Sequence, residues 1–519
     1  MNDGSPVYLI ALVGTLIVML GIGVWVSRRN RSGEDFLLAG RKLGTPLLMG
    51  TTLATLVGTG SSLGAVGFAY ENGWAGALYG IGGAAGVLAL VWLFSDVRRH
   101  GFMTFAEEMS YYFGANRLIK AVVSVVLLLA SVGWLGAHIM GGALYLSFLT
   151  GMEPALAKVV VALGFGLYTV VGGYLAVVVT DALQGTILFV GFTVLAVVSL
   201  VYTGGFSGIQ EGAPEEATSM LGIEALGALP ALSLALVIAV GVLATPSYRQ
   251  RIYSAADVGT VRRSFTWVAL LFAVFAVLPA VAGLAARAID PGLANPDAAF
   301  PMLATTVFPV WLGAFLLVAG LSATMSSGDS DAVAGVTILL RDVVQLVTGR
   351  LPRAEHMVRY SRIALVGVLV LALAGALVAD TIIDYITLMI STVLTGLLVA
   401  SLLGKFWPRA TWQGGLAAMV GGSAVALAVQ NIAAWSEFWG NPVIPSMAAA
   451  LVAGVAVSLV TPRSRVTREE ALRLLAEERA ALDVGTHLRG GEDSDAADAP
   501  GGGAQRADGT GTEPPEPRA

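Results

Sequence analysis

The stretch Ala323-Thr324-Met325-Ser326-Ser327 places three neutral oxygen atoms on one patch of a helix. The carbonyl of Ala323 lies beside the side chains three and four positions further on, which are the hydroxyls of Ser326 and Ser327. A small hard cation prefers oxygen ligands, and neutral oxygens hold a monovalent ion without adding buried charge. The spacing therefore predicts part of a sodium-sized cation site, although paired serines are equally typical of contacts between membrane helices.

Two acids follow the serines on the same helix. Asp329 and Asp331 lie one turn further along, inside an otherwise apolar run. An acid within a membrane helix marks a functional site, but a water-exposed acid paired with an arginine fits the pattern equally well. The roles of both acids therefore stay open.

Membrane helices must position these residues. The 519-residue chain is 56% hydrophobic and only 13% charged, whereas soluble domains carry roughly 25% charge. About 20 apolar residues cross a bilayer as a helix, and many such runs are present. We predict an all-α polytopic membrane protein with about thirteen spans, at roughly 6–27, 44–71, 74–95, 119–148, 155–178, 183–204, 228–248, 264–286, 309–340, 361–379, 383–404, 412–434 and 443–461. Because cysteine is absent, disulfides and thiol chemistry are excluded.

The distribution of lysine and arginine predicts the orientation. Of the 25 basic residues before residue 469, 23 fall in alternate loops, which positive-inside patterning assigns to the cytoplasm. The N-terminus is then outside and the C-terminus cytoplasmic, in a multi-pass protein of the plasma membrane. We predict a transporter domain over 1–461 and a cytoplasmic tail over 462–519, which is largely disordered apart from one surface helix after residue 468.

Two of the predicted spans are interrupted at their centres. The second span, 44–71, carries a cluster of glycines from Gly58 to Gly67, and Pro246 interrupts the span 228–248. Irregular backbone at membrane depth persists only where protein or water satisfies it, and matched interruptions in two halves indicate a transporter binding site. The breaks are five spans apart, which predicts an inverted repeat of five plus five helices, over about 44–204 and 228–404. We expect the first break to add two more carbonyl ligands to the cation site, those of Val57 and Gly60.

Four stretches resemble the sodium:solute symporter family, in the same order along residues 6–461. They are LVGTGSSLGAVGFAYENG at 56–73, GGYLAVVVTDALQG at 172–185, YRQRIYSAAD at 248–257 and ATMSSGDS at 323–330. The resemblance implies the LeuT-type inverted-repeat fold, sodium-coupled uptake by alternating access, and a sodium site between the interrupted span 44–71 and the span 309–340. Carried onto this chain, its ligands are the carbonyls of Val57, Gly60 and Ala323 and the hydroxyls of Ser326 and Ser327.

The solute is expected at the two breaks, facing the spans 119–148 and 383–404. The polar and aromatic candidates there are Ser61, Ser62, Trp134, His138, Thr245, Ser247, Tyr248 and Tyr385. No lysine or arginine lies at the predicted midplane depth, yet helix N-termini can also bind an anion, so neutral, zwitterionic and carboxylate solutes all stay open. Residues expected nearer the cytoplasm, with gating contacts as their role, are Asp181, Gln184 and Arg251.

These observations predict a secondary transporter that imports a small organic solute with sodium, and that meets no nucleic acid. A proton-coupled symporter with Asp329 as the titrating group is the first alternative, and a channel or sensor without coupling is the second. An enzyme is disfavoured because no histidine or lysine accompanies Ser326 or Ser327 in sequence. A nucleotide-driven pump is disfavoured because no GxxxxGK[ST] loop occurs.

Overall fold

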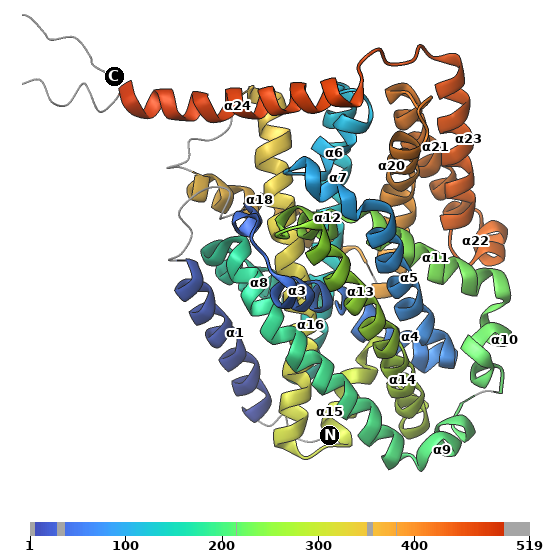
Figure 1. Cartoon of the computed structure of the whole chain (residues 1–519). Helices are drawn as coiled ribbons and strands as arrows, with labels where there is room; N and C mark the ends of the chain where they lie inside the picture. Colours follow the sequence, from blue (N-terminus) through green and yellow to red (C-terminus); the bar gives the residue numbers. More distant parts are fainter. Residues whose placement is uncertain (1–5, 28–36, 214, 350–356, 380, 493–519) are drawn as a thin grey trace, which may run out of the picture.

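A computed structural model describes residues 6–27, 37–213, 215–349, 357–379 and 381–492. This part of the chain is a bundle of helices (Figure 1). The longer helices are α1 (Pro6–Ser27), α3 (Thr45–Leu56), α5 (Ala77–Phe94), α7 (Arg117–Thr150), α8 (Pro154–Tyr202), α11 (Ala228–Ala244), α13 (Val258–Phe275), α14 (Val277–Ile289), α16 (Val310–Ile338), α18 (Met357–Leu377), α20 (Thr395–Phe406), α21 (Trp412–Asn431), α23 (Val443–Val460) and α24 (Arg468–Glu492).

Shorter helical segments connect and extend these helices. The α-helical ones are α4 (Ala65–Asn72), α6 (Phe105–Tyr112), α9 (Gly205–Glu211), α10 (Ile223–Leu226), α12 (Pro246–Ser254), α15 (Ala299–Thr306), α17 (Gln345–Thr348), α19 (Ile382–Met389) and α22 (Ala433–Trp439). The single turns that the site uses are η2 (Gly60–Gly64), η7 (Pro296–Ala298), η8 (Leu339–Val344) and η10 (Ile390–Leu394). The other single turns are η1 (Ala39–Arg41), η3 (Gly73–Gly76), η4 (Ser95–His100), η5 (Glu215–Thr218) and η6 (Met220–Gly222).

The predicted spans can be matched to these helices. Ten helices of the described residues are long and apolar enough to cross a membrane, or eleven when the bent pair α11 and α12 counts as one. The other two predicted spans are shorter pieces. The span 44–71 consists of α3, η2 and α4, and the described apolar part of the span 155–178 is Pro154–Gly164.

Both predicted interruptions are breaks in the helical backbone. Helix α3 ends at Leu56, and a wide five-residue turn, η2, precedes α4. Helix α11 ends before Pro246, with Thr245 in an extended conformation (φ −69°, ψ 131°), and α12 leaves at an angle of 45°. The reason is steric, because proline disfavours the helical conformation of the residue before it and starts a new helix well.

A third break lies inside the predicted span 155–178, so the following span covers Gly173–Tyr202 and begins ten residues before the predicted 183. Gly173, inside α8, has φ 66° and ψ 179°, which is a conformation essentially restricted to glycine. The chain therefore turns at the GGYLAVVVTD stretch, where the family resemblance places a turn between spans.

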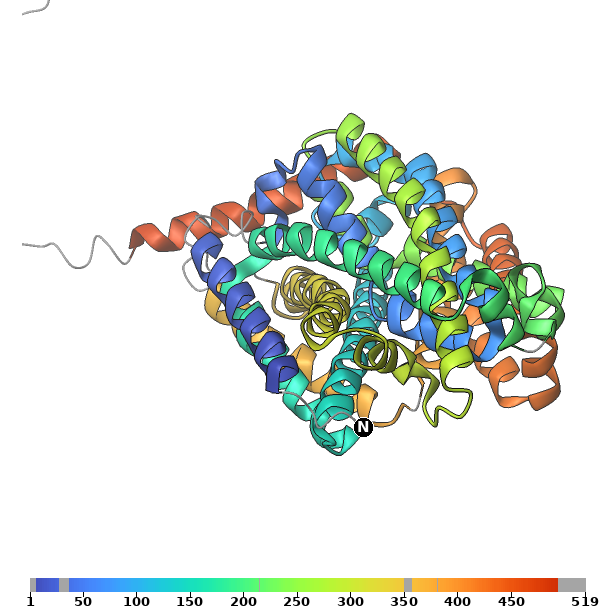
Figure 2. The same cartoon turned by 90° about the horizontal axis from the view of Figure 1, so that it is seen from below.

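Helix α16 lies in the interior of the bundle. Figure 2, a view along the bundle, shows α16 among α1, α7 and α8, and nearly every residue from 319 to 338 is buried. Protein rather than lipid surrounds the hydroxyls and acids of this helix. Its polar composition is therefore compatible with membrane depth, because intramembrane polar groups face the interior of a bundle.

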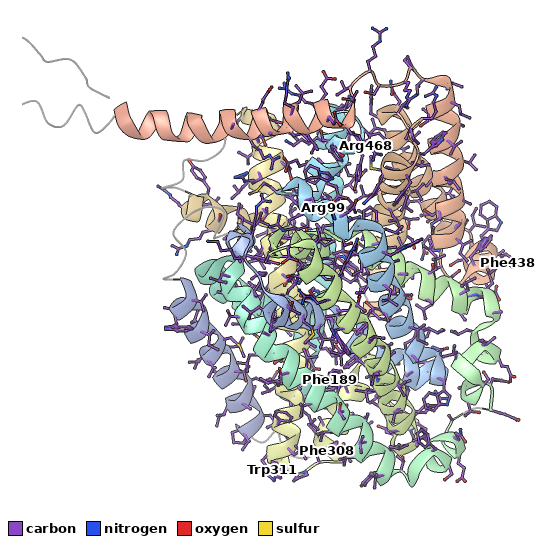
Figure 3. All side chains as sticks on the ribbon, in the orientation of Figure 1. Arg99, Phe189, Phe308, Trp311, Phe438 and Arg468 are labelled. Carbon is purple, nitrogen blue, oxygen red and sulfur yellow. The ribbon has the colours of Figure 1, made fainter. Side chains whose placement is uncertain are left out.

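Helix α24 lies across one end of the bundle, at the upper edge of Figure 1. Its Leu475 is buried, and Glu478 pairs with Lys120 of α7 at 3.3 Å. Arg468, labelled in Figure 3, donates to the carbonyl of Gly404 at the end of α20. The predicted surface helix of the tail is therefore docked on the bundle, while the predicted disordered stretch from residue 493 lies outside the described residues.

Candidate functional site

The end of α3 lies against the two serines of α16. Ser326 donates its hydroxyl hydrogen to the carbonyl of Ala54 at 3.0 Å, and Ser327 donates to the carbonyl of Thr55 at 3.0 Å. Helix α3 ends at Leu56, so these carbonyls belong to its last turn, where no amide four residues further on closes a helical bond. The break in the chain therefore supplies carbonyl oxygens without a helical partner, and the two hydroxyls donate to them.

The other predicted ligands lie around the same point. Ser326 Oγ is 3.4 Å from the carbonyl of Ala323, as the helical spacing predicts. Val57 caps α3 with non-helical angles (φ −84°, ψ 64°), which turns its carbonyl away from the helical ladder. The carbonyl of Gly60 is engaged differently, because it accepts the backbone N–H of Ala65 at the end of η2. Thus Ala54, which the sequence prediction omitted, contacts the serines, and Gly60 is already bonded.

Gly58 allows this close approach. A Cβ atom at this position would lie 2.7 Å from Ser327 Oγ and 3.2 Å from His138 Cε1. Any side chain here would push α16 and α7 away from the break. The requirement at Gly58 is therefore space, which only the tertiary structure reveals.

A cavity of about 450 Å³ opens beside the two breaks. Five of the eight predicted solute candidates line it, namely Trp134, His138, Thr245, Ser247 and Tyr248. Its other lining residues are Thr55, Leu56, Gly58, Gly60, Tyr79, Ile238, Val242, Phe272 and Asp331. The cavity thus joins both interrupted helices to α5, α7, α13 and α16.

Two hydrogen bonds connect the cavity walls across the bundle. The indole Nε1–H of Trp134 donates to the hydroxyl of Thr245 at 2.9 Å, which ties α7 to the break after α11. The hydroxyl of Tyr248 donates to the carbonyl of Thr55 at 3.5 Å, which ties α12 to the end of α3. Each contact joins elements that the sequence separates by more than a hundred residues.

The three remaining solute candidates lie elsewhere. Ser61 donates to the carbonyl of Leu56 and Ser62 to that of Gly58, so both hydroxyls satisfy local backbone at the break. Tyr385 of α19 is half-buried and does not line the cavity, and its hydroxyl would be 2.6 Å from a Cβ placed on Gly136. Their position at or opposite the breaks selected these residues, but their contacts depend on helix rotation.

The two acids of α16 have separate environments. Asp331 lines the cavity and its Oδ2 lies 3.3 Å from His138 Nε2. The other nitrogen of His138, Nδ1, lies 2.9 Å from the hydroxyl of Thr59. Asp329 is fully buried and does not line the cavity. Asp331 is therefore buried and paired with a histidine, which differs from the alternative of a water-exposed acid paired with an arginine.

The predicted gating residues form a buried polar cluster between α3, α8, α12 and α16. Arg251 Nη2 lies 3.1 Å from Asp181 Oδ2, and both side chains are fully buried. The same nitrogen contacts Thr51 Oγ1 at 2.8 Å and Ser330 Oγ at 2.8 Å. Gln184 is also buried, but among the described residues its side-chain amide has no hydrogen-bond partner. Two of the three residues thus meet directly.

Comparisons with known proteins identify the family. The family model described as "Sodium:solute symporter family" matches residues 36–422. The chain belongs to the sodium:solute symporter family. It is 27% identical over 468 residues to the sodium/pantothenate symporter of Escherichia coli, covering 86% of this chain and 95% of the relative. It is 26% identical over 471 residues to the high-affinity proline transporter PutP of Bacillus subtilis, covering 86% and 98%.

Solved structures confirm the predicted fold. A Na⁺-coupled sialic acid symporter in a substrate-bound outward-open state has a TM-score of 0.77 at 18% identity, covering 89% of this chain and 99% of that chain. Mhp1, a nucleobase-cation-symport-1 transporter, has a TM-score of 0.57 at 15% identity, covering 88% and 99%. The symporter is therefore a multi-pass membrane protein of the LeuT-type fold. It couples transport of a small solute to sodium, as its family does.

The symporter contains a second buried ion pair that the sequence analysis missed. Arg249 Nη1 lies 3.1 Å from Glu108 Oε1, with both side chains fully buried. Tyr112 and Tyr253 both donate their hydroxyls to the Glu108 carboxylate, and the Arg249 guanidinium lies over the ring of Phe94. The sequence shows Arg249 in the YRQR stretch, but its partner Glu108 lies 141 residues away along the chain. No local pattern in the sequence indicates this pair.

A further acid lies at the end of the bundle opposite α24. Asp297 of η7 packs against Gly67 of α4, where a Cβ would be 2.7 Å from its Oδ1. The N–H of Ile382, the first residue of α19, donates to its Oδ2 at 3.5 Å. Exclusion of water by these neighbours raises the pKa of Asp297 to about 7, against the opposing effect of the Ile382 amide. The carboxyl therefore joins both halves of the repeat at this end.

Proposed function

We propose that this chain imports a small organic solute across the plasma membrane by alternating access, with one sodium ion bound between α3 and α16. The observation that carries the proposal is the contact of Ser326 and Ser327 with the freed carbonyls at the end of α3. Each hydroxyl keeps acceptor lone pairs while it donates to a carbonyl, and each carbonyl keeps a second lone pair. The break and α16 therefore gather neutral oxygens at one point, which is the ligand type that a small hard cation prefers.

The proposed sodium ligands are the hydroxyls of Ser326 and Ser327 and the carbonyls of Ala54, Val57 and Ala323. Ala54 replaces Gly60 in the sequence-derived set, because the Ala54 carbonyl contacts Ser326 directly, whereas no hydrogen bond joins Gly60 to either serine among the described residues. All five ligand atoms are neutral oxygens, so the ion brings its full charge into the bundle without a carboxylate. This chemistry suits weak, reversible binding of a monovalent ion better than calcium, which favours carboxylates.

The solute is proposed to occupy the cavity between the two breaks. Its lining of aromatic and apolar side chains with a few polar groups is typical of small-molecule sites. The relatives named above transport pantothenate, proline and sialic acid, which are all small polar solutes. Because the cavity and the serines share the backbone of residues 54–60, occupation of one site can favour occupation of the other.

The orientation and the gates complete the proposal. Alternation of basic loops supports an external N-terminus and a cytoplasmic end that carries α24. The buried cluster of Arg251 and Asp181 would then close the path on the cytoplasmic side, and Gln184 is buried one turn further along α8. Opening of the cytoplasmic side must either separate this desolvated ion pair or move both residues together. The pair would therefore control the opening.

Uptake into proteoliposomes tests the function. The purified protein is reconstituted, and labelled proline, pantothenate and other small solutes are offered under a sodium gradient or under a proton gradient in sodium-free buffer. We expect uptake only with sodium. Uptake driven equally by protons would overturn the coupling and favour the proton-coupled alternative.

A further inference from the structure

Asp331 brings a partly unsatisfied carboxylate to the cavity wall. It lies on α16, one turn beyond Ser327, and its side chain is only 4% exposed. Oδ2 contacts His138 Nε2 at 3.3 Å, whereas Oδ1 has no hydrogen-bond partner in the described part of the chain. A buried acceptor without a donor costs free energy, and more when it is charged. A molecule in the cavity that donates a hydrogen bond to Oδ1 would therefore be stabilised there.

His138 holds this carboxylate in place. Its Nε2–H donates to Asp331 Oδ2, and its Nδ1 lies 2.9 Å from the Thr59 hydroxyl oxygen. The ring also stacks on Trp134, with centroids 6.5 Å apart. Because its partners are on α7 and at the first break, the imidazole has little freedom to turn and satisfy Oδ1 as well. The second carboxylate oxygen is left for another molecule.

The rest of the cavity wall offers aromatic surface and hydroxyls. Among the described residues that line it, Asp331 is the one carboxylic acid and there is no lysine or arginine. Tyr79, Tyr248 and Phe272 contribute ring surface. Ser247 Oγ is a second lining atom without a hydrogen-bond partner in the described part of the chain. A carboxylate oxygen without a donor favours a positive group, which aromatic rings also attract.

We propose that the transported solute carries a primary or secondary ammonium group, which donates to Asp331 Oδ1 while its carbon skeleton packs against the aromatic wall. This inference rests on the proposed transport function and names the solute class. An ammonium satisfies both needs of the site, since it neutralises the carboxylate and supplies the missing hydrogen-bond donor. A hydroxyl would satisfy only the second, and an organic cation suits aromatic walls better than a metal ion, which needs more oxygen ligands.

Matched solutes test the class. The probes are proline and cyclopentanecarboxylate, which share a five-membered ring and a carboxylate but differ in the amine, together with the other protein amino acids, pantothenate and glucose. Binding is measured as the rise in melting temperature of the purified protein in sodium buffer. Uptake is then measured in proteoliposomes for every probe that binds. We expect at least one amine-bearing probe to bind and cyclopentanecarboxylate, pantothenate and glucose to fail.

Asp331→Asn and Ser322→Ala are the matched variants. Asp331→Asn keeps the shape of the side chain and removes its charge, and we expect the half-saturating concentration of the amine to rise roughly tenfold to a hundredfold. Ser322→Ala removes a buried hydroxyl without a partner on the same helix and should leave that value unchanged. Sodium alone should raise the melting temperature of both variants as in the wild type.

The outcomes separate this inference from the transport function. A solute without an amine as the best substrate, no binding by any amine, or an unchanged half-saturating amine concentration in Asp331→Asn would each overturn the ammonium assignment. Loss of the sodium-induced rise in Asp331→Asn would do so too, because Asp331 would then serve sodium. Uptake that ignores the sodium gradient would instead defeat the proposed function, whichever solute is carried.

Discussion

Removal of one serine hydroxyl from α16 should weaken sodium binding without unfolding the symporter. Ser327→Ala removes a proposed ligand atom that lies 3.0 Å from the carbonyl of Thr55. Ser326→Ala removes its neighbour, which lies 3.0 Å from the carbonyl of Ala54. Both serines are almost completely buried, so water cannot replace the lost oxygen freely.

The size of the effect follows from the ligand count. A hydrogen bond or dipole contact to a charged group contributes about 1.5–3 kcal/mol in proteins. At about 1.4 kcal/mol for each factor of ten, losing one of five neutral oxygens should raise the half-saturating sodium concentration roughly tenfold to a hundredfold. The hydroxyl also donates to a carbonyl, whose loss of a partner should lower stability without sodium by about 1–3 kcal/mol.

The assay needs no knowledge of the solute. Purified protein is titrated with sodium at constant ionic strength, with potassium as the balancing ion, and the melting temperature is recorded. Binding to the folded state alone raises stability with ion concentration, so the midpoint of the rise reports affinity. Ser322→Ala is the control, because that buried hydroxyl on the same helix has no hydrogen-bond partner among the described residues.

The result that would refute the site is specific. If both serine variants melt at lower temperature without sodium but keep a midpoint within a factor of two of the wild type, the hydroxyls only join α3 to α16. If Ser322→Ala shifts the midpoint as far as Ser327→Ala, the effect is a general one on α16. The double variant of Ser326 and Ser327 should abolish the sodium response.

Three further predictions address other parts of the structure. Gly58→Ala should lower sodium-driven uptake at least tenfold, because its Cβ would lie 2.7 Å from Ser327 Oγ, while Gly14→Ala on α1, with open space around it, should leave uptake unchanged. Equal uptake by both variants would contradict the close approach. Glu108→Gln should lower the free energy of unfolding by about 3–5 kcal/mol, measured in detergent, because Arg249 would stay buried without its counter-charge. A change below about 1 kcal/mol would show that the pair is not desolvated as the structure has it. Asp297 has a pKa raised to about 7, so its protonated form stabilises the folded arrangement below about pH 4 and that contribution is lost as the pH rises through 7. The melting temperature should therefore fall between pH 5 and 8 in the wild type and less in Asp297→Asn, and identical slopes would exclude this carboxyl as the cause.

Local patterns accounted for much of the fold. The apolar runs predicted α16 to within two residues at each end, and Pro246 predicted the break before α12, because hydrophobic length and proline geometry act within a few residues. The helical spacing also predicted the patch formed by Ala323, Ser326 and Ser327, since residues three and four apart share a face in any helix. The comparisons confirm the family and the fold that these patterns indicated.

Contacts between helices required the tertiary structure. Ala54 rather than Gly60 meets the serines because the packing of α3 on α16 sets the register, and a shift of one turn leaves every local pattern unchanged. The same holds for the cavity, where the rotation of each helix decides that Trp134 faces inward and Tyr385 does not.

The buried pairs of charged residues show most clearly what the sequence alone does not determine. The sequence by itself placed Asp331 inside a predicted span and Arg249 just beyond the end of one. It could not determine that the partners are His138 and Glu108, which are 193 and 141 residues away along the chain. Periodicity describes one helix at a time, whereas an ion pair depends on the depth and rotation of two helices together, and only their packing sets both.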